Sequence, residues 1–137
     1  MVNFKFLPHT ADIKFQAFGL ELEDCFKNAS YSVKDIISKD KIKNIEKKKI
    51  NVKGKDFESL LYNFLEEFLV LFDSEGFLLG KVEKIEIDKD KFKLKADVSG
   101  DNAKNYEIES HVKAITYSEM FVKKENHKWI CQVVVDV

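Results

Sequence analysis

Acidic groups near the two ends of the chain are the residues best suited to chemistry in this sequence. Asp12 follows a polar turn near the N-terminus, and Asp136 stands beside the terminal carboxylate of Val137. Carboxylate oxygens suit hard cations such as calcium, magnesium and manganese. Three anionic groups held together without a cation would repel one another, and at least one would take up a proton. If folding brings the ends together, a divalent metal site is expected; otherwise Asp12 caps a turn and Asp136 is a solvated strand end.

Other catalytic arrangements find little support. The sequence contains no G-x-S-x-G elbow, P-loop, dinucleotide fingerprint or H-E-x-x-H motif. Cys25 falls on an apolar helical stripe and Cys131 within a strand pattern, so a reactive thiolate is disfavoured at both. His9, His111 and His127 fall on three predicted loops without the spacing of a zinc site. We therefore predict no catalytic residue.

Composition narrows the class of protein. At 137 residues with 45% hydrophobic and 34% charged residues, the chain is expected to form a single domain over residues 1–137. All 23 basic residues are lysine, and without the planar fork of arginine, direct sequence-specific nucleic-acid binding is not expected. The run 47–49 of three lysines is interpreted as a solvated strand edge rather than a nucleic-acid patch. Without a signal peptide or an apolar run that could span a membrane, we expect a cytoplasmic protein.

Periodicity predicts an α+β domain. Apolar residues recur every three or four positions in two segments, which predicts amphipathic helices from Leu22 to about Ser38 and, capped by Asp56, from Phe57 to Gly76. Alternation predicts strands at 3–7, 13–18, 42–52, 82–87, 92–98, 115–122 and 129–136, with 100–109 as a polar loop. The last strand is apolar on both faces and is expected to be central. Adjacent hairpins then imply two helices packed on mainly antiparallel sheet.

Three segments resemble the motifs of a known family. The run HTADIKFQAFG at 9–19 closely resembles the opening motif of the archease family. VKAITY at 112–117, the closing VDV at 135–137 and DSEG at 73–76 fit the same pattern in the right order. The resemblance covers essentially the whole chain. It implies an archease-like fold and a protein cofactor of the RtcB-type tRNA-splicing ligase, which promotes ligase guanylylation and multiple turnover.

The resemblance also implies roles for individual residues. Family members bind a metal through the aspartate of the HTAD motif and the last two residues, which are Asp12, Asp136 and Val137 in this chain. Calcium is the first expectation, with magnesium or manganese as alternatives. Lys113 of the VKAxTY motif and His9 of the HTAD motif are candidates for partner contact, although Lys113 also fits an exposed residue at a strand entry.

The sequence departs from the family pattern in two places. Ser118 stands where many members have a histidine, and the 100–109 segment lacks a basic, histidine-containing stretch. These differences question a role for that segment. The expected function is a non-enzymatic activator that presents its metal end to the ligase. The alternatives are a chaperone or general protein-binding module, with both aspartates structural, and a small metal-dependent phosphohydrolase, for which no general base is apparent.

Overall fold

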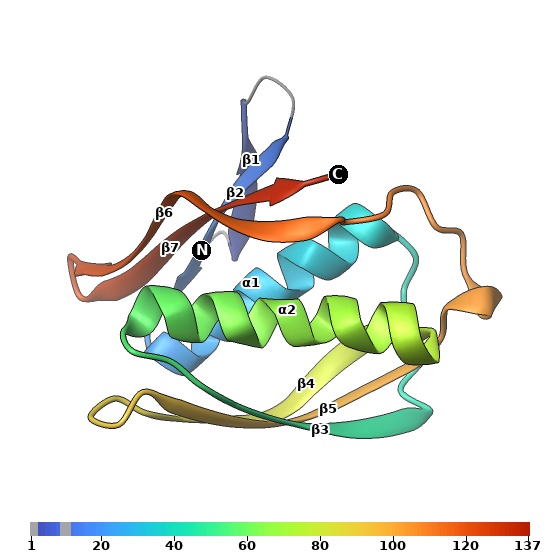
Figure 1. The fold of residues 1–137 in the computed structure, drawn as a ribbon, viewed down its shortest axis with the longest axis horizontal. Coiled ribbons are helices and arrows are strands. Elements are labelled where there is room, and N and C mark those ends of the chain that lie inside the picture. The colour runs from blue at the N-terminus through green and yellow to red at the C-terminus, as the bar shows by residue number, and fades with distance from the viewer. Residues whose placement is uncertain (1–2, 9–11) are drawn as a thin grey trace.

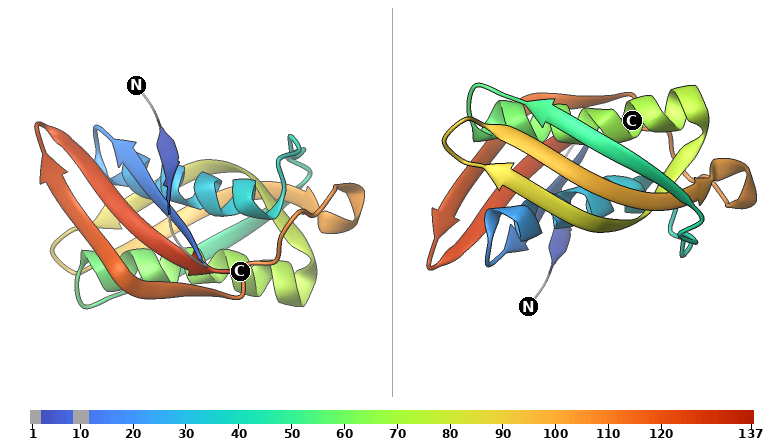
Figure 2. Two further views of the ribbon diagram at one scale, coloured as in Figure 1. Left: turned by 90° about the horizontal axis from the view of Figure 1, so that it is seen from above. Right: turned by 90° about the horizontal axis from the view of Figure 1, so that it is seen from below.

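The computed structural model describes residues 3–8 and 12–137, which form two antiparallel sheets with two α-helices between them (Figures 1 and 2). The four-stranded sheet has the order β1 (Phe4–Leu7), β2 (Ile13–Gly19), β7 (Lys128–Asp136), β6 (Ala114–Glu125). The three-stranded sheet has the order β3 (Glu46–Lys53), β5 (Lys93–Asn102), β4 (Phe77–Asp88). Each helix, α1 (Leu22–Ile37) and α2 (Phe57–Glu75), contacts strands of both sheets. The predicted α+β class is confirmed.

One continuous core runs through the helical layer. The rings of Phe26 on α1 and Phe64 on α2 stack with centroids 6.2 Å apart, and both side chains are fully buried. Phe15 of β2 and Ile50 of β3 belong to the same cluster, from the inner faces of the two sheets. Because α2 is enclosed by helix and sheet on several sides, it is apolar around most of its circumference. No helix in the described part of the chain combines the length and apolar character that a membrane span needs.

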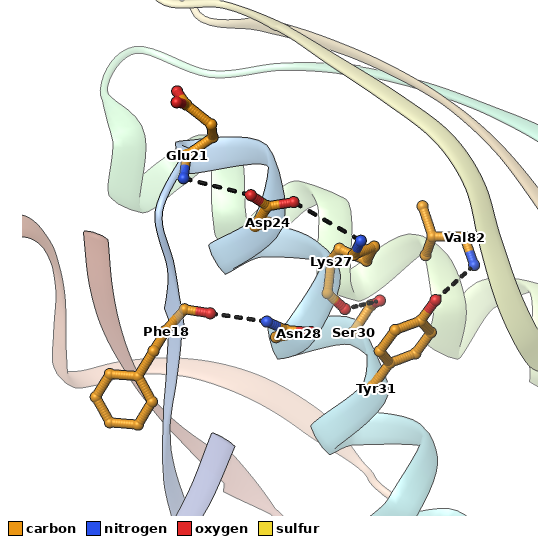
Figure 3. Close-up of polar contacts among 8 residues, drawn as sticks. All are labelled: Phe18, Glu21, Asp24, Lys27, Asn28, Ser30, Tyr31 and Val82. Carbon is orange, nitrogen blue, oxygen red and sulfur yellow. Dashed lines mark hydrogen bonds and ion pairs between the residues drawn. The ribbon is translucent and has the colours of Figure 1, made fainter. Parts of the chain in front are cut away.

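Polar contacts fix α1 against both sheets (Figure 3). The Asn28 side-chain amide donates to the carbonyl of Phe18 on β2, at 2.7 Å. On the other side, the Tyr31 hydroxyl accepts from the backbone N–H of Val82 on β4, at 3.0 Å. Asn28 is buried, so leaving its side-chain amide without this hydrogen-bond partner would cost free energy of folding. The helix is therefore hydrogen-bonded to a strand of each sheet and links the two.

Several boundaries differ from the predicted ones, and the strand predicted at 82–87 begins earlier, at Phe77. The third strand begins at Glu46, and Ile42 lies in the preceding loop, where it is buried against the core. The prediction of a loop over 100–109 is wrong at its start, because β5 continues to Asn102. The charged loop predicted at 123–128 is shorter, because β6 and β7 extend to a two-residue turn at Asn126 and His127, with φ of 51° and 64°. Two residues with positive φ are the geometry that two-residue hairpins favour.

A buried carboxylate organises the segment after β5. Asp101 accepts hydrogen bonds from the Tyr106 hydroxyl at 2.7 Å and from the backbone N–H of Asn102 at 2.7 Å. The same Tyr106 oxygen accepts from the backbone N–H of Lys43, at 2.9 Å. These bonds join the loop before β3 to the segment that leads into β6. They also hold the pKa of Asp101 below its usual value, with the Tyr106 hydroxyl as the largest cause.

We expect Asp101 to make stability sensitive to acid. The pKa of Asp101 is lower in the folded than in the unfolded chain. Its contribution to the free energy of unfolding is therefore complete above the pKa of the unfolded chain, about 4, and is lost as pH falls through the pKa of the folded chain. Urea unfolding from pH 7 to pH 2 should therefore show a smaller loss of stability for Asp101→Asn than for the native chain. Asp90→Asn, at an exposed turn, is the control and should follow the native profile. Identical profiles for Asp101→Asn and the native chain would contradict the assignment.

Candidate functional site

The pairing of β2 with β7 brings residues near the two ends of the chain together. The strands are antiparallel, with Ile13 opposite Val135. Asp12 directly precedes Ile13, and Asp136 directly follows Val135, so the two aspartates lie across from each other at one end of the sheet. Residues opposite each other in antiparallel strands have Cβ atoms about 5 Å apart on the same face of the sheet. This register gives the candidate site its geometry.

Strand β6 adds a third element at the same end of the sheet. Its first residue, Ala114, pairs with Asp136. The backbone N–H of Lys113 donates to the carbonyl of Asp136 at 2.7 Å. Lys113 is exposed, so a cationic side chain emerges next to the aspartates. The structure thus places Lys113 at the entry of β6, as the strand-entry alternative expected, and its contact with a partner stays a prediction.

The donor chemistry of this end suits a hard cation. Asp136 is exposed, Asp12 is half-buried, and neither forms an ion pair with another described residue. Val137 is half-buried against the core, which restrains the chain terminus. Two aspartates and a terminal carboxylate offer oxygen ligands alone, the type that calcium and magnesium take. Within residues 3–8 and 12–137, no group of three His, Cys, Asp or Glu side chains could hold a metal ion.

A shallow cleft of about 450 Å³ lies beside Asp12. Asp35 on α1 and Glu109 ahead of β6 contribute to its lining, together with Phe6, Ile13 and Ile36. Sequence reasoning missed Asp35 and Glu109, because nothing in their local patterns distinguishes them from solvated surface carboxylates. His9, predicted as a partner contact, lies outside the described residues.

The remaining candidates from the sequence do not form a catalytic site in the described residues. Cys25 and Cys131 are buried, and a hydrogen bond with Cys25 together with burial raises the pKa of the Cys131 thiol, which keeps it protonated. His111 packs against Phe72 of α2, with ring centroids 6.0 Å apart. His127 lies in the turn at the opposite end of β7 from Asp136. The burial of both cysteines agrees with the apolar patterns in which the sequence places them.

Comparison with known proteins decides the family. The model of the Archease protein family matches residues 4–137. The chain belongs to the archease family. It is 38% identical to protein archease of Pyrococcus abyssi and 37% identical to protein archease of Thermococcus kodakarensis, with 100% of each chain covered in both cases. The resemblance inferred from the motifs is therefore confirmed.

Solved structures of archease relatives support the same fold. The solution structure of protein 1598 from Methanobacterium thermoautotrophicum has a TM-score of 0.84 at 29% identity, covering 98% of this chain and 99% of that chain. A crystal structure from Thermotoga maritima, described as an archease and possible chaperone, has a TM-score of 0.60 at 19% identity, covering 97% and 96%. The second likeness concerns the fold alone.

Two positions of the archease motifs have clear structural surroundings. Tyr117 of the VKAITY segment stacks on Tyr62 of α2, with ring centroids 4.4 Å apart and planes 7° apart. Desolvation of the phenol groups is the largest cause that raises the pKa of both. Ser118, which departs from the family pattern, is exposed in the segment between Thr116 and Phe121 where the register of β6 on β7 shifts. Sequence reasoning did not identify Tyr62, because its contact with Tyr117 is long-range.

Proposed function

We propose that this member of the archease family is a non-enzymatic activator of the RtcB-type tRNA-splicing ligase. In this proposal it promotes guanylylation of the ligase and multiple turnover. A divalent hard cation, calcium in the first instance and magnesium or manganese otherwise, is bound by Asp12, Asp136 and the terminal carboxylate of Val137. The observation that carries the proposal is the register that sets Ile13 opposite Val135 and so brings Asp12 and Asp136 to one end of the four-stranded sheet.

Each residue has a distinct task in this proposal. Asp12 and Asp136 hold the cation from the ends of two hydrogen-bonded strands, which restrict their movement. Lys113, bonded through its backbone to Asp136, adds positive charge near an anionic group of the partner. When bound, the cation supplies positive charge and coordination positions that three protein ligands leave open to water or to a phosphate or carboxylate of the partner.

The test compares site variants with a matched acidic control. Asp12→Ala and Asp136→Ala each remove one ligand, and Asp90→Ala removes an exposed aspartate of the β4–β5 turn. Calcium binding is measured by calorimetry on the isolated protein, and RNA ligation is measured with limiting ligase and excess RNA. We expect calcium affinity to fall at least about tenfold in both site variants, with most of the stimulation lost. Full stimulation by both site variants would refute the assignment of the site.

A second candidate function is a chaperone or general protein-binding module. The description of the Thermotoga maritima relative suggests this role for that protein. In the present chain, Phe6 and Tyr117 are 40% and 54% exposed, and they lie on β1 and β6, the two edge strands of the four-stranded sheet. Edge strands with exposed apolar groups can pair with other chains. Suppression of aggregation of an unrelated protein without ligase, unchanged in Asp12→Ala and Asp136→Ala, would favour this alternative.

A further inference from the structure

No helix or strand among the described residues covers the outer face of the three-stranded sheet. In the view from below, β3, β5 and β4 lie in front of the helices, and no other described element covers them (Figure 2). Their inner face carries buried residues such as Ile50 and Val98. Because side chains alternate along a strand, the residues between these point to the open face. That face is on the opposite side of the helical layer from the four-stranded sheet.

Lysine dominates the open face. The seven lysines that it carries are exposed and come from all three strands: Lys47, Lys49, Lys53, Lys81, Lys84, Lys93 and Lys95. The accessible carboxylates on the same face are Glu83, Glu86, Asp88 and Asp97, whereas Asp101, at a later alternate position of β5, is buried and bonded to Tyr106. Seven lysines against four carboxylates leave a net charge of +3, whereas the whole chain has a net charge of −1. The positive charge is therefore concentrated on this sheet.

Fewer than half of these lysines are held in ion pairs. Three are neutralised by ion pairs, Lys49 with Asp97 at 3.1 Å, Lys81 with Glu83 at 3.4 Å and Lys84 with Glu86 at 3.1 Å. The other four, which form no ion pair with any residue that the structure describes, are Lys47, Lys53, Lys93 and Lys95. The unpaired charges lie on the edge strand β3 and the central strand β5.

The three lysines of the run 47–49 do not point to the same face of the sheet. Lys48 turns toward the helices, where it pairs with Glu75 at 2.5 Å and lies 5.9 Å from the centroid of the Phe77 ring. Lys47 and Lys49 point outward and join the lysines of β4 and β5. The interpretation of the run as only a solvated strand edge is therefore incomplete.

The face is also hollowed. Two adjoining depressions, of about 310 Å³ and 700 Å³, share Lys49 and Asp97 in their linings. The first extends toward Lys95 and the second toward Lys47. A cationic depression that crosses three strands fits a convex, polyanionic surface better than a single small anion.

We propose that this face binds the phosphate backbone of duplex nucleic acid without sequence preference. Lysines act as point charges toward phosphates, whereas base-reading forks of arginine are absent from the chain. No aromatic residue of the three described strands lies on the outer face to stack an unpaired base, which disfavours single strands. Protein interfaces are anchored by aromatic and aliphatic side chains. None of the large exposed apolar residues of the described chain lies on these three strands, and Ile45 directly precedes β3. Charge without such anchors favours a phosphate backbone over an acidic protein.

The test uses two variants with the same change in net charge. The first replaces the four unpaired lysines of the face, as Lys47→Gln, Lys53→Gln, Lys93→Gln and Lys95→Gln. The control replaces four exposed lysines elsewhere, as Lys39→Gln, Lys104→Gln, Lys123→Gln and Lys124→Gln. Binding to a fluorescent 20-base-pair RNA duplex, a DNA duplex and an RNA single strand is followed by anisotropy between about 50 and 200 mM salt, the range in which phosphate contacts respond strongly. Circular dichroism confirms that both variants are folded.

We expect the native protein and the control to bind the duplexes, and the face variant to lose at least about tenfold in affinity. The slope of log K against log salt should become shallower by about 0.9 for each phosphate contact that is removed. Equal binding of RNA and DNA duplexes supports recognition of the shared backbone, and tighter binding of RNA supports an A-form stem as the ligand. The proposal is overturned if both variants lose affinity equally, if no duplex binds at the lowest salt, or if the single strand binds more tightly than the duplexes. It is also overturned if polyglutamate displaces the labelled duplex as well as unlabelled duplex does, which would indicate an acidic protein partner. Since no ligase is present, this result is independent of the proposed activator function.

Discussion

Extending the chain by two glycines after Val137 is expected to lower its calcium affinity on the order of 10- to 100-fold and to remove most of the ligase stimulation. The extension turns the Val137 carboxylate into a neutral peptide carbonyl and moves the terminal charge up to about 7 Å away. A set of two aspartates and a neutral carbonyl carries one less negative charge than the native set. Since Val137 packs against the core, the extension leaves the position of the native residue unchanged. Calorimetry with calcium and the ligation assay measure the two effects.

The matched control for the extended chain is Val137→Ala. This substitution keeps the terminal carboxylate and shortens a half-buried side chain, so we expect calcium affinity close to that of the native protein. If the extended chain binds calcium as tightly as the native chain, the terminus is not a ligand. Asp12 and Asp136 would then need to be tested as a site of their own, because the set of three proposed above would be wrong.

Replacing Gly100 with alanine is expected to destabilise the protein by more than about 3 kcal/mol, above the usual range for added methyl groups in a core. A Cβ atom at this position would lie 2.0 Å from the carbonyl oxygen of Leu78 and 2.9 Å from Cζ of Phe77. Gly100 lies in the central strand β5, paired with Glu46 on β3 and Leu79 on β4. Relief of the clash requires a movement of strand backbone, which disturbs both pairings. Urea unfolding at pH 7 measures the loss of stability.

Gly76→Ala is the control for Gly100→Ala. Gly76 closes α2 with φ of 65°, and a Cβ atom there would lie 3.7 Å from the Asn102 side-chain oxygen, with no clash. The cost is therefore limited to the left-handed conformation, about 1 kcal/mol. If Gly100→Ala costs no more than Gly76→Ala, then β4 and β5 adjust to an added methyl group more easily than this geometry allows.

Local patterns were sufficient to predict both helices and their ends. The apolar spacing from Leu22 onward, the Asp56 cap and Gly76 at the end of the second helix are each properties of neighbouring residues, and the structure retains all three. The apolar residues on both faces of 129–136 correctly predicted that this strand is central. These features follow from backbone periodicity and capping, which act over a few residues and are readable without knowledge of the fold.

The candidate metal end was predicted in part. The sequence identified Asp12 and Asp136 as oxygen donors that would be useful only if the chain ends met. The pairing of Ile13 with Val135 puts the two residues at the same edge, through strands separated by more than a hundred positions. Neither local propensity nor composition specifies such a register, so the meeting of the ends was a hypothesis that only strand pairing could decide. The binding of a metal there is still a prediction.

By itself, the sequence determined the α+β class, the order of the elements and the lysine-only basic surface. The tertiary structure decided that the strands divide into two sheets around the helices, and that Gly100 lies in a central strand rather than a loop. It also decided that Lys48 turns inward while Lys47 and Lys49 join lysines from other strands on one open face. The physical reason is that periodicity fixes which face of its own element a residue occupies. Long-range strand pairing and packing decide which other elements that face meets.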